Sequence, residues 1–206
     1  TATSTPTGKL KQVKILIDWQ PSAEYFGFFY AKATGLYASA GYNVEIEYGN
    51  GAPEVAKTVG VGAAAIGTTT SDNLVRQLAD GGGFSRARAL LKFNPAVVAA
   101  LSPTDIRTLP DLKGKRLGTN PGASVYRQFL QAARTSTVEA FGVTEDPTIG
   151  WSGIPQLLDN SDRGVDAILA YTTNVVIDLE LAGHAVNEIF LGENGIKSYG
   201  LVLIAC

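Results

Sequence analysis

Three aromatic side chains, Trp19, Tyr25 and Phe26, follow the first strand-like run of the chain. Their rings offer flat apolar faces on which a ring-shaped or apolar ligand can stack. Two acids, Asp18 and Glu24, lie among them and have the chemistry to exchange protons with a bound ring. We expect Asp18 instead to bond to backbone N–H groups of the turn, so the chemistry predicted for this stretch is binding.

Hydroxyl groups and unpaired backbone N–H groups make a second set of candidates, at the starts of two expected helices. Thr68 and Thr69 close an apolar run, and Gly122, Ala123 and Ser124 open a later amphipathic helix. N–H groups at a helix start are donors that suit a carboxylate, phosphate, sulfonate or ring carbonyl. Helix capping alone would also explain the hydroxyl residues.

The chain is poor in groups that catalyse reactions. It has one His and one Cys, and it lacks the common nucleophile, zinc and P-loop motifs. His184 follows a glycine just after an expected helix, where a cation is favourable. These observations predict a protein that is not an enzyme and that has no metal and no cofactor.

The candidate residues are held by alternating strand-like and helix-like segments. Val13, Ile15 and Ile17 alternate with polar residues as in a strand, and Pro21 ends that pattern. Further strands are expected at residues 44–48, 63–67, 88–93, 96–101, 115–118, 165–170, 188–191 and 198–205. Strands separated by helices favour parallel sheets covered on both faces, and such sheets bind ligands at the carboxyl ends of their strands.

Composition limits the choice of partners. The chain has 206 residues, of which 45% are hydrophobic, so it can fill a core. A net charge of -2 spread along the sequence argues against nucleic acid. The longest apolar run, residues 95–101, is far shorter than the ~20 residues that span a bilayer. The Thr/Ser/Pro-rich start is typical of an exported protein after its signal peptide has been removed.

The order of several motifs resembles the substrate-binding proteins of ABC importers. These motifs are DWxPxxxYxGFxxAKxxGLYxxxGxxVEIxxG, LxDLKGKRLG, VDAILAYTTN and SYGLVLIA, and they extend from Val13 to Ala205. The group most similar in pattern is the thiamine-pyrimidine-precursor type, which is related to the nitrate, sulfonate, taurine and riboflavin binders.

The resemblance implies an α/β fold with two lobes, the type 2 periplasmic-binding-protein fold. Its sheets are mostly parallel and flanked by helices, and a two-stranded hinge joins the lobes. We place lobe 1 at residues 9–97 plus 196–206 and lobe 2 at residues 98–195. The family continues after its last strand with C-terminal helices that this sequence lacks.

The resemblance also implies which residues bind the ligand. In lobe 1 they are Trp19, Tyr25, Phe26, Thr68, Thr69 and Asn94, and in lobe 2 they are Gly122, Ala123, Ser124, Tyr126, Tyr171 and Asn174. Trp19 and Tyr25 would be aromatic walls. Two positions depart from the family pattern: Ser22 stands where relatives often have Asn, and Phe26 stands where some have His. A ligand that relied on that imidazole would lose it.

The function implied is that of the extracytoplasmic solute-binding component of an ABC importer, located in the periplasm or at the cell surface and with a lipid anchor as one option. The ligand would be a small ring-bearing metabolite, such as the thiamine pyrimidine precursor or a similar heterocycle, captured by closure of the cleft. Its partners would be this ligand and the membrane permease, and the protein would be a monomer. Two alternatives remain: an enzyme on the same fold, of the pyrimidine-synthase or menaquinone-pathway kind, and the ligand-sensing domain of a regulator.

Overall fold

Two compact units make up the chain. The computed structural model describes residues 9–119, 125, 128–129, 144–146, 154–158 and 164–206. Unit 1 comprises residues 1–92 and 199–206, and unit 2 comprises residues 93–198. The chain therefore passes between the units twice, at 92/93 and at 198/199, where the sequence analysis places the divisions at 97/98 and 195/196. Asn94 falls in unit 2.

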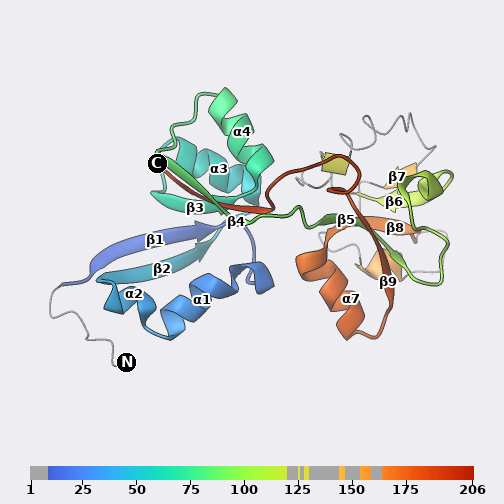
Figure 1. Ribbon diagram of the computed structural model, residues 1–206, viewed down its shortest axis with the longest axis horizontal. Coiled ribbons are helices and arrows are strands. Elements are labelled where there is room, and N and C mark those ends of the chain that lie inside the picture. Colours follow the sequence, from blue (N-terminus) through green and yellow to red (C-terminus); the bar gives the residue numbers. More distant parts are fainter. Residues whose placement is uncertain (1–8, 120–124, 126–127, 130–143, 147–153, 159–163) are drawn as a thin grey trace. The chain divides into compact units, whose positions relative to one another are not determined.

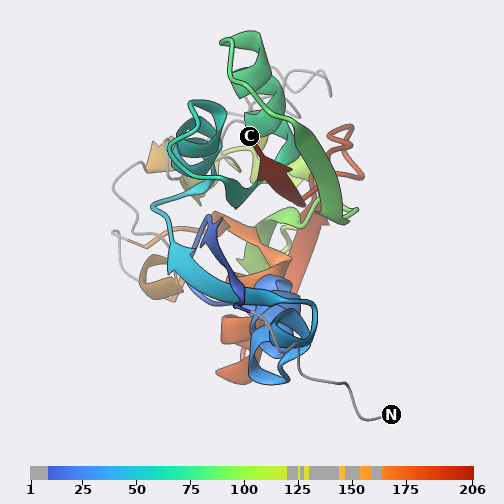
Figure 2. The ribbon, with the colours of Figure 1, turned by 90° about the vertical axis from the view of Figure 1, so that its left-hand side faces the viewer.

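Unit 1 contains a five-stranded sheet with the strand order β2-β1-β3-β10-β4. Its elements are β1 (Lys11–Ile17), η1 (Ala23–Tyr25), α1 (Phe26–Ala33), α2 (Leu36–Ser39), β2 (Tyr42–Tyr48), α3 (Ala52–Gly60), β3 (Ile66–Thr69), α4 (Ser71–Ala79), β4 (Arg86–Leu91) and β10 (Leu201–Ala205). β1 pairs in parallel with β2 and β3, whereas β10 is antiparallel to both β3 and β4. Figure 2 shows β10, in dark red, beside the green β4.

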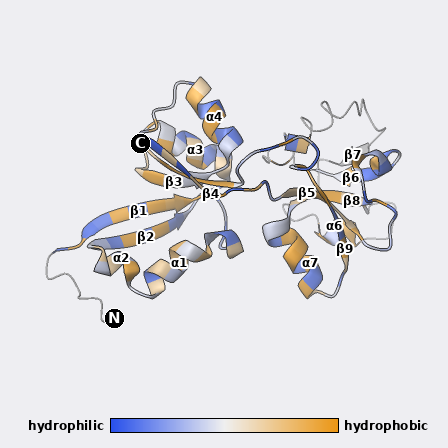
Figure 3. Ribbon diagram, in the orientation of Figure 1, coloured by the Kyte–Doolittle hydropathy of each residue, from blue (hydrophilic) through white to orange (hydrophobic). Residues whose placement is uncertain are grey.

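Helices cover both faces of this sheet, because β1 is apolar on both sides. Ile15 and Ile17 pack on one face with residues of α1, and Leu16 packs on the other with Val55 and Val59 of α3. Figure 1 shows α1 and α2 on one side of the sheet and α3 and α4 on the other. In Figure 3, β1 changes from hydrophilic at its start to hydrophobic toward the end that carries the candidate residues.

Unit 2 also contains a five-stranded sheet, with the order β7-β6-β8-β5-β9. Its elements are β5 (Ala96–Leu101), η2 (Leu109–Leu112), β6 (Arg116–Gly118), β7 (Thr144–Asp146), α6 (Ile154–Leu157), β8 (Ala167–Tyr171), η3 (Thr172–Val176), α7 (Ile177–Leu181) and β9 (Val186–Phe190). Val125, Gln128 and Phe129 are helical, as the sequence predicts. The expected start of that helix, at residues 121–124, lies outside the described residues.

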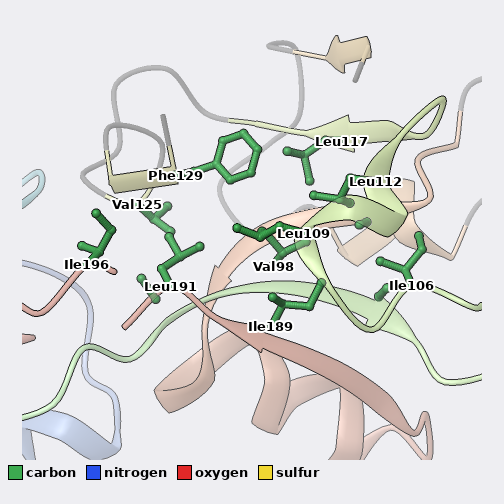
Figure 4. Packing of buried hydrophobic residues seen from close by; sticks show 13 residues of the cluster. Val98, Ile106, Leu109, Leu112, Leu117, Val125, Phe129, Ile189, Leu191 and Ile196 are labelled. Carbon is green, nitrogen blue, oxygen red and sulfur yellow. The ribbon is translucent and has the colours of Figure 1, made fainter. Parts of the chain in front are cut away.

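Two apolar clusters lie on the two faces of the second sheet. The cluster in Figure 4 joins alternate residues of the strands, such as Val98 and Leu117, to Val125 and Phe129 and to the short turn η2. The other cluster joins the opposite sides of β5 and β8 to α7, through residues such as Leu179. Because each fully buried aliphatic side chain contributes roughly 1.5–3 kcal/mol, these clusters fix the strand ends that carry the candidate residues.

The two sheets have the same topology, with four strands in one direction and one reversed strand. The reversed strands are β10 in unit 1 and β5 in unit 2, and each lies second from an edge of its sheet. Each is also the first strand after the chain passes from one unit to the other. A strand that runs parallel to its neighbour needs a crossover connection, usually a helix, that brings the chain back to the end where the neighbour begins. Among the described residues, no helix precedes β5 or β10 after the chain enters the unit, and both strands are antiparallel to their neighbours. The predicted α/β fold with mostly parallel, helix-flanked sheets is confirmed.

Candidate functional site

In unit 1, the candidate residues lie where β1 and β3 end. The two strands are parallel, with Leu16 opposite Gly67, so their carboxyl ends meet at one edge of the sheet. β1 ends at Ile17 and leads directly into Asp18. The third strand was expected at residues 63–67, but it spans residues 66–69 because the glycine-rich segment before it forms a turn. The threonines are therefore its last residues.

A buried hydrogen-bond network joins these strand ends to the start of α1. The hydroxyl of Tyr25 donates to Oδ1 of Asp18 at 3.0 Å, and the hydroxyl of Thr68 donates to the same oxygen. The backbone N–H of Asp18 donates in turn to Oγ1 of Thr68 at 2.9 Å. The Asp18 carboxylate thus accepts hydrogen bonds from side-chain hydroxyls of two other elements, where the sequence analysis expects bonds from backbone N–H groups of its own turn. Glu24, the second acid of the segment, accepts from the Ser22 hydroxyl at 3.2 Å.

The environment of this network changes how its groups ionise. Burial raises the pKa of the Asp18 carboxyl above its ordinary value, because the charged form loses its hydration. The hydrogen bonds from Thr68 and Tyr25 lower the same pKa, but by less. The pKa of Tyr25 is also raised, first by burial and then by the charge of Asp18. Tyr25 therefore keeps its proton and acts as a donor.

The three aromatic residues of the first motif occupy different environments. Tyr25 is only 1% exposed and packs in the core of unit 1, so within this unit its ring supports the sheet edge and does not form an open wall. Trp19 is half-buried and rests against the same core cluster. Phe26 is 65% exposed at the start of α1, with its ring centroid 5.4 Å from that of Tyr30. Trp19 and Phe26 thus have surface to offer to a ligand.

The hydroxyl groups at the end of β3 serve the structure of unit 1. Thr69 is fully buried, and its hydroxyl donates to the backbone carbonyl of Ala52 at 2.8 Å. Thr70 is the N-cap of α4, and Asn73 donates to its hydroxyl at 2.7 Å. Ser71 exchanges two hydrogen bonds with the backbone of the segment that leads into β10. Thr70 thus occupies the capping position that the sequence suggests, but its side chain makes no cap hydrogen bond to the helix backbone, and its hydroxyl donates to Oδ1 of Asp72.

In unit 2, Asn94 lies just before β5 and is buried. Its amide nitrogen donates to Oε1 of Gln128 at 2.9 Å and to the carbonyl of Ile196 at 3.1 Å. Its amide oxygen accepts the backbone N–H of Ala96 at 3.0 Å. This side chain thus joins the start of β5, a helix and the segment after β9.

The end of β8 carries the other described candidates of unit 2. Tyr171 is the last residue of β8, is half-buried and lies opposite Ala96 of β5. Asn174 lies in the wide helical turn η3, and its side-chain oxygen accepts the N–H of Val175. The remaining candidates, Gly122, Ala123, Ser124 and Tyr126, lie outside the described residues.

Two polar residues of unit 2 were missed by the sequence analysis. Gln128 is buried on the helix that covers β6 and bonds to Asn94. Thr119 is buried directly after β6, as Asp18 is directly after β1. The signal available for Thr119 was its position as the first polar residue after a strand, the criterion that had drawn attention to Asp18.

The imidazole of the chain lies apart from these strand ends. His184, the single imidazole of the sequence, follows Gly183 just after α7, and the backbone N–H of His184 donates to the carbonyl of Leu179 at 3.0 Å. The described residues contain no group of three or more His, Cys, Asp or Glu side chains arranged to hold a metal ion. None of the described helices has both the length and the apolar character needed to cross a membrane.

Known proteins share this sequence pattern and fold. The riboflavin-binding protein RibY of Chloroflexus aurantiacus is 25% identical over an alignment of 209 positions, which covers 95% of this chain and 58% of that protein. A protein of Haemophilus influenzae named for thiamine biosynthesis is 22% identical over an alignment of 206 positions, which covers 97% of this chain and 63% of that protein. The chain thus spans about six tenths of the length of these curated relatives.

Among solved structures, the periplasmic aliphatic sulphonate binding protein SsuA from Escherichia coli aligns with a TM-score of 0.69 at 17% identity. The alignment covers 95% of this chain and 65% of that one. This similarity shows the fold, that of the two-lobed periplasmic binding proteins. The family model described as "NMT1/THI5 like" matches residues 22–206. The match covers most of the sequence, and we conclude that the chain belongs to the NMT1/THI5-like family.

Proposed function

We propose that this chain is the solute-binding component of an ABC importer, working outside the cytoplasm with a membrane permease. Its ligand is a small ring-bearing metabolite, such as the pyrimidine precursor of thiamine or a similar heterocycle. The family resemblance implies that both units contribute contacts and that ligand binding closes the lobes. The protein acts as a monomer.

The observation that carries this proposal is the position of Trp19. Its half-buried indole follows Asp18, whose backbone and carboxylate are both bonded to Thr68 of the neighbouring strand. A binding protein needs an aromatic face that is rigidly held before the ligand arrives, because ordering it during binding would cost affinity. The buried network at the adjacent Asp18 restrains the backbone that carries Trp19 and supplies that rigidity.

Three features support a ring-bearing ligand. Trp19 and the exposed Phe26 supply flat apolar faces that stack on heterocycles. The relatives named above are described as a riboflavin-binding protein and a thiamine biosynthesis protein, and both names refer to compounds that contain aromatic heterocycles. The charge of the chain, -2 overall, offers no strong attraction for a highly charged anion.

Binding without catalysis fits the inventory of side chains. The single His lies at the end of α7, and the single Cys is Cys206. Asp18 is buried and bonded to two hydroxyl groups, which suits a structural carboxylate better than an acid or base that must reach a substrate. We therefore favour transport over the pyrimidine-synthase and menaquinone-pathway alternatives.

The test begins with native mass spectrometry of freshly purified protein, to detect any small molecule bound to it. Calorimetry then measures the affinities for riboflavin, 4-amino-5-hydroxymethyl-2-methylpyrimidine and, as a ligand without an aromatic ring, taurine. We expect one of the two heterocycles to bind more tightly than taurine. Preference for taurine, or no binding by any of the three, would contradict the proposed ligand class.

Trp19→Ala assigns the site. Stacking contributes ~0.5–1.5 kcal/mol beyond simple burial, so the variant should bind the preferred heterocycle several-fold more weakly. The control is Tyr42→Ala, which removes an exposed aromatic ring from the start of β2. Tyr42 is paired with Lys11 at the beginning of β1. It therefore lies at the amino end of these strands, whereas Trp19 follows their carboxyl end. Equal effects of the two variants would refute the assignment.

A further inference from the structure

The two sheets place two residues at equivalent positions. In the shared strand order, β1 corresponds to β6 and β3 corresponds to β8, and both pairs are parallel. The residue that follows β1 is Asp18, and the residue that follows β6 is Thr119. Each therefore lies at the carboxyl edge of its own sheet, the edge at which open α/β sheets bind ligands.

The two equivalent residues differ in their partners. Asp18 is buried and accepts hydrogen bonds from two hydroxyl groups. Thr119 is only 1% exposed, and its hydroxyl has no hydrogen-bond partner among the residues that the structure describes. A buried hydroxyl without a partner is costly, and native proteins rarely keep one without a reason. A partner that arrives with a ligand is such a reason.

The register places Thr119 at the rim of an apolar cluster. Leu117 and Gly118 lie opposite Ala167 and Ile168 of β8. Continuing this register by one residue places Thr119 level with Leu169, two positions before Tyr171. Alternation of side chains along the strand puts Thr119 on the same face as Leu117. That face carries the cluster shown in Figure 4, which includes Phe129 and against which Tyr171 packs.

Other polar groups lie at the same rim. Gln128 neighbours Phe129 on the covering helix and accepts a hydrogen bond from Asn94. Tyr171 is paired with Ala96, two residues after Asn94. An apolar floor with a few polar groups at its edge is the usual make-up of a small-molecule site. In the low dielectric of such a site, a hydrogen bond to a buried hydroxyl is stronger than one in water.

A second buried polar atom without a hydrogen-bond partner lies elsewhere in unit 2. Oε2 of Glu188 is also buried and has no partner among the described residues. Glu188 lies in the middle of the edge strand β9, opposite Ala99, and not at a strand end. Thr119 therefore differs from Glu188 in its position, because Thr119 lies at the carboxyl end of a strand, where open α/β sheets bind ligands.

From these observations we infer that the hydroxyl of Thr119 is a ligand-binding group, which forms a hydrogen bond with a polar ring atom or ring substituent of the metabolite. A threonine hydroxyl both donates and accepts, so a ring carbonyl, a ring nitrogen or an exocyclic amine can satisfy it. This inference rests on the proposed function and assigns a polar ligand contact to unit 2.

The test uses two substitutions of Thr119 and one control. Thr119→Val keeps the shape and removes the hydroxyl, whereas Thr119→Ser keeps the hydroxyl. The control is Thr104→Val, which removes a hydroxyl of unit 2 that donates to the carbonyl of Leu101 at 2.7 Å. For each variant, calorimetry measures the affinity for riboflavin and for 4-amino-5-hydroxymethyl-2-methylpyrimidine, and urea denaturation measures the stability of the ligand-free protein.

We expect Thr119→Val to weaken binding of the preferred heterocycle about three- to tenfold, the value of one hydrogen bond, without lowering the urea midpoint of the ligand-free protein. Thr119→Ser should bind within twofold of the original chain. Thr104→Val should lower the urea midpoint and leave the affinity unchanged, because it breaks an internal bond.

Three outcomes would overturn the inference. The first is unchanged affinity in Thr119→Val while Trp19→Ala binds more weakly, which leaves the proposed function standing. The second is a lowered urea midpoint in ligand-free Thr119→Val, which would mean that the hydroxyl has an internal partner. The third is failure of the original chain to bind either heterocycle, which removes the proposed function together with the inference.

Discussion

Tyr25 donates a hydrogen bond to the carboxylate of Asp18 at 3.0 Å, and both residues are buried in unit 1. This bond links the start of α1 to the end of β1. Tyr25→Phe removes only the donor and leaves a buried carboxylate with one partner fewer. We expect a loss of about 1–3 kcal/mol in the free energy of unfolding, measured by urea denaturation.

The control for this prediction is Tyr30→Phe. Tyr30 lies on α1, close to Tyr25 in sequence, but it is 51% exposed. Removing a hydroxyl from an exposed position usually changes stability by no more than ~0.5 kcal/mol. If Tyr25→Phe were as mild as Tyr30→Phe, the buried bond would not hold the end of β1.

The raised pKa of Asp18 predicts an unusual pH dependence. Burial makes this carboxyl bind its proton more tightly in the folded chain than in the unfolded chain. Between the two pKa values the folded state holds more protons, so the contribution of Asp18 to stability is fully present below its unfolded pKa and is lost as the pH rises through the folded one. The stability of the original chain relative to Asp18→Asn should therefore fall as the pH rises above about 4.

Asp111 provides the opposite case in unit 2. The Thr108 hydroxyl, followed by the backbone N–H groups of Arg107 and Thr108, lowers the pKa of this carboxyl below its ordinary value. Its contribution to stability is present above the unfolded pKa and is lost as the pH falls. Urea denaturation between pH 3 and pH 8 should therefore give slopes of opposite sign for Asp18→Asn and Asp111→Asn, each relative to the original chain. Slopes of the same sign would contradict the assignment for Asp18.

Many of the strands and helices could be predicted from the sequence, because the spacing of apolar residues along the chain reflects which face of each element is buried. The strand at residues 96–101 was predicted with the bounds that the structure has, since an unbroken apolar run between Pro95 and Ser102 leaves little choice. The direction of that strand was not predictable. Alternation of side chains is the same in parallel and antiparallel strands, so the reversed positions of β5 and β10 follow only from the two passages between units.

The candidate site was harder to predict because its polar groups are used by partners far away in the sequence. Thr68 bonds to a residue 50 positions before it, and the hydroxyl of Thr69 bonds to the carbonyl of Ala52. The family resemblance implies that the ring of Tyr25 forms a wall of the ligand site. In unit 1 the ring is buried and its hydroxyl bonds to the buried carboxylate of Asp18, because a hydrogen bond in such a low-dielectric environment is strong. Such pairings depend on tertiary contacts and leave no local signal. The assignment of Trp19 to the ligand stays a prediction.

Gly67 should tolerate no side chain, because β3 packs closely beneath α3. A Cβ atom at this position would lie 2.7 Å from Cγ1 of Val55, 2.9 Å from Cγ2 of Val59 and 3.1 Å from the carbonyl oxygen of Leu16. Gly67→Ala should therefore cost about 1–3 kcal/mol of stability, as overpacked cores do. The measurement is the thermal unfolding midpoint.

Gly27→Ala is the matched control for this substitution. Nothing lies within 4 Å of a Cβ atom built at Gly27, which is in the first turn of α1. Alanine favours helices over glycine by up to ~1 kcal/mol, so this variant should be as stable as the original chain or more stable. Equal destabilisation by both substitutions would show that the packing of β3 under α3 is not the cause.

Asn94 is predicted to be a structural residue of unit 2. Asn94→Ala removes three buried hydrogen bonds, which Asn94 makes with the side chain of Gln128, the carbonyl of Ile196 and the N–H of Ala96. Because each buried polar group left unpaired costs about 1–3 kcal/mol, we expect a loss of at least ~2 kcal/mol in the free energy of unfolding. Hydrogen exchange should show faster exchange at the amide of Ala96, which bonds directly to Asn94.

Asn43→Ala is the control for Asn94, since its side chain donates to Gln12 at 2.7 Å in an exposed position, where a lost bond is replaced by water. It should change stability by no more than ~0.5 kcal/mol. A ligand contact without a structural role would behave differently from our expectation: Asn94→Ala would then weaken ligand binding while leaving both stability and exchange at Ala96 unchanged. That result would return Asn94 to the ligand contacts that the family resemblance implies, and it would mean that the three bonds seen in unit 2 contribute little to its fold.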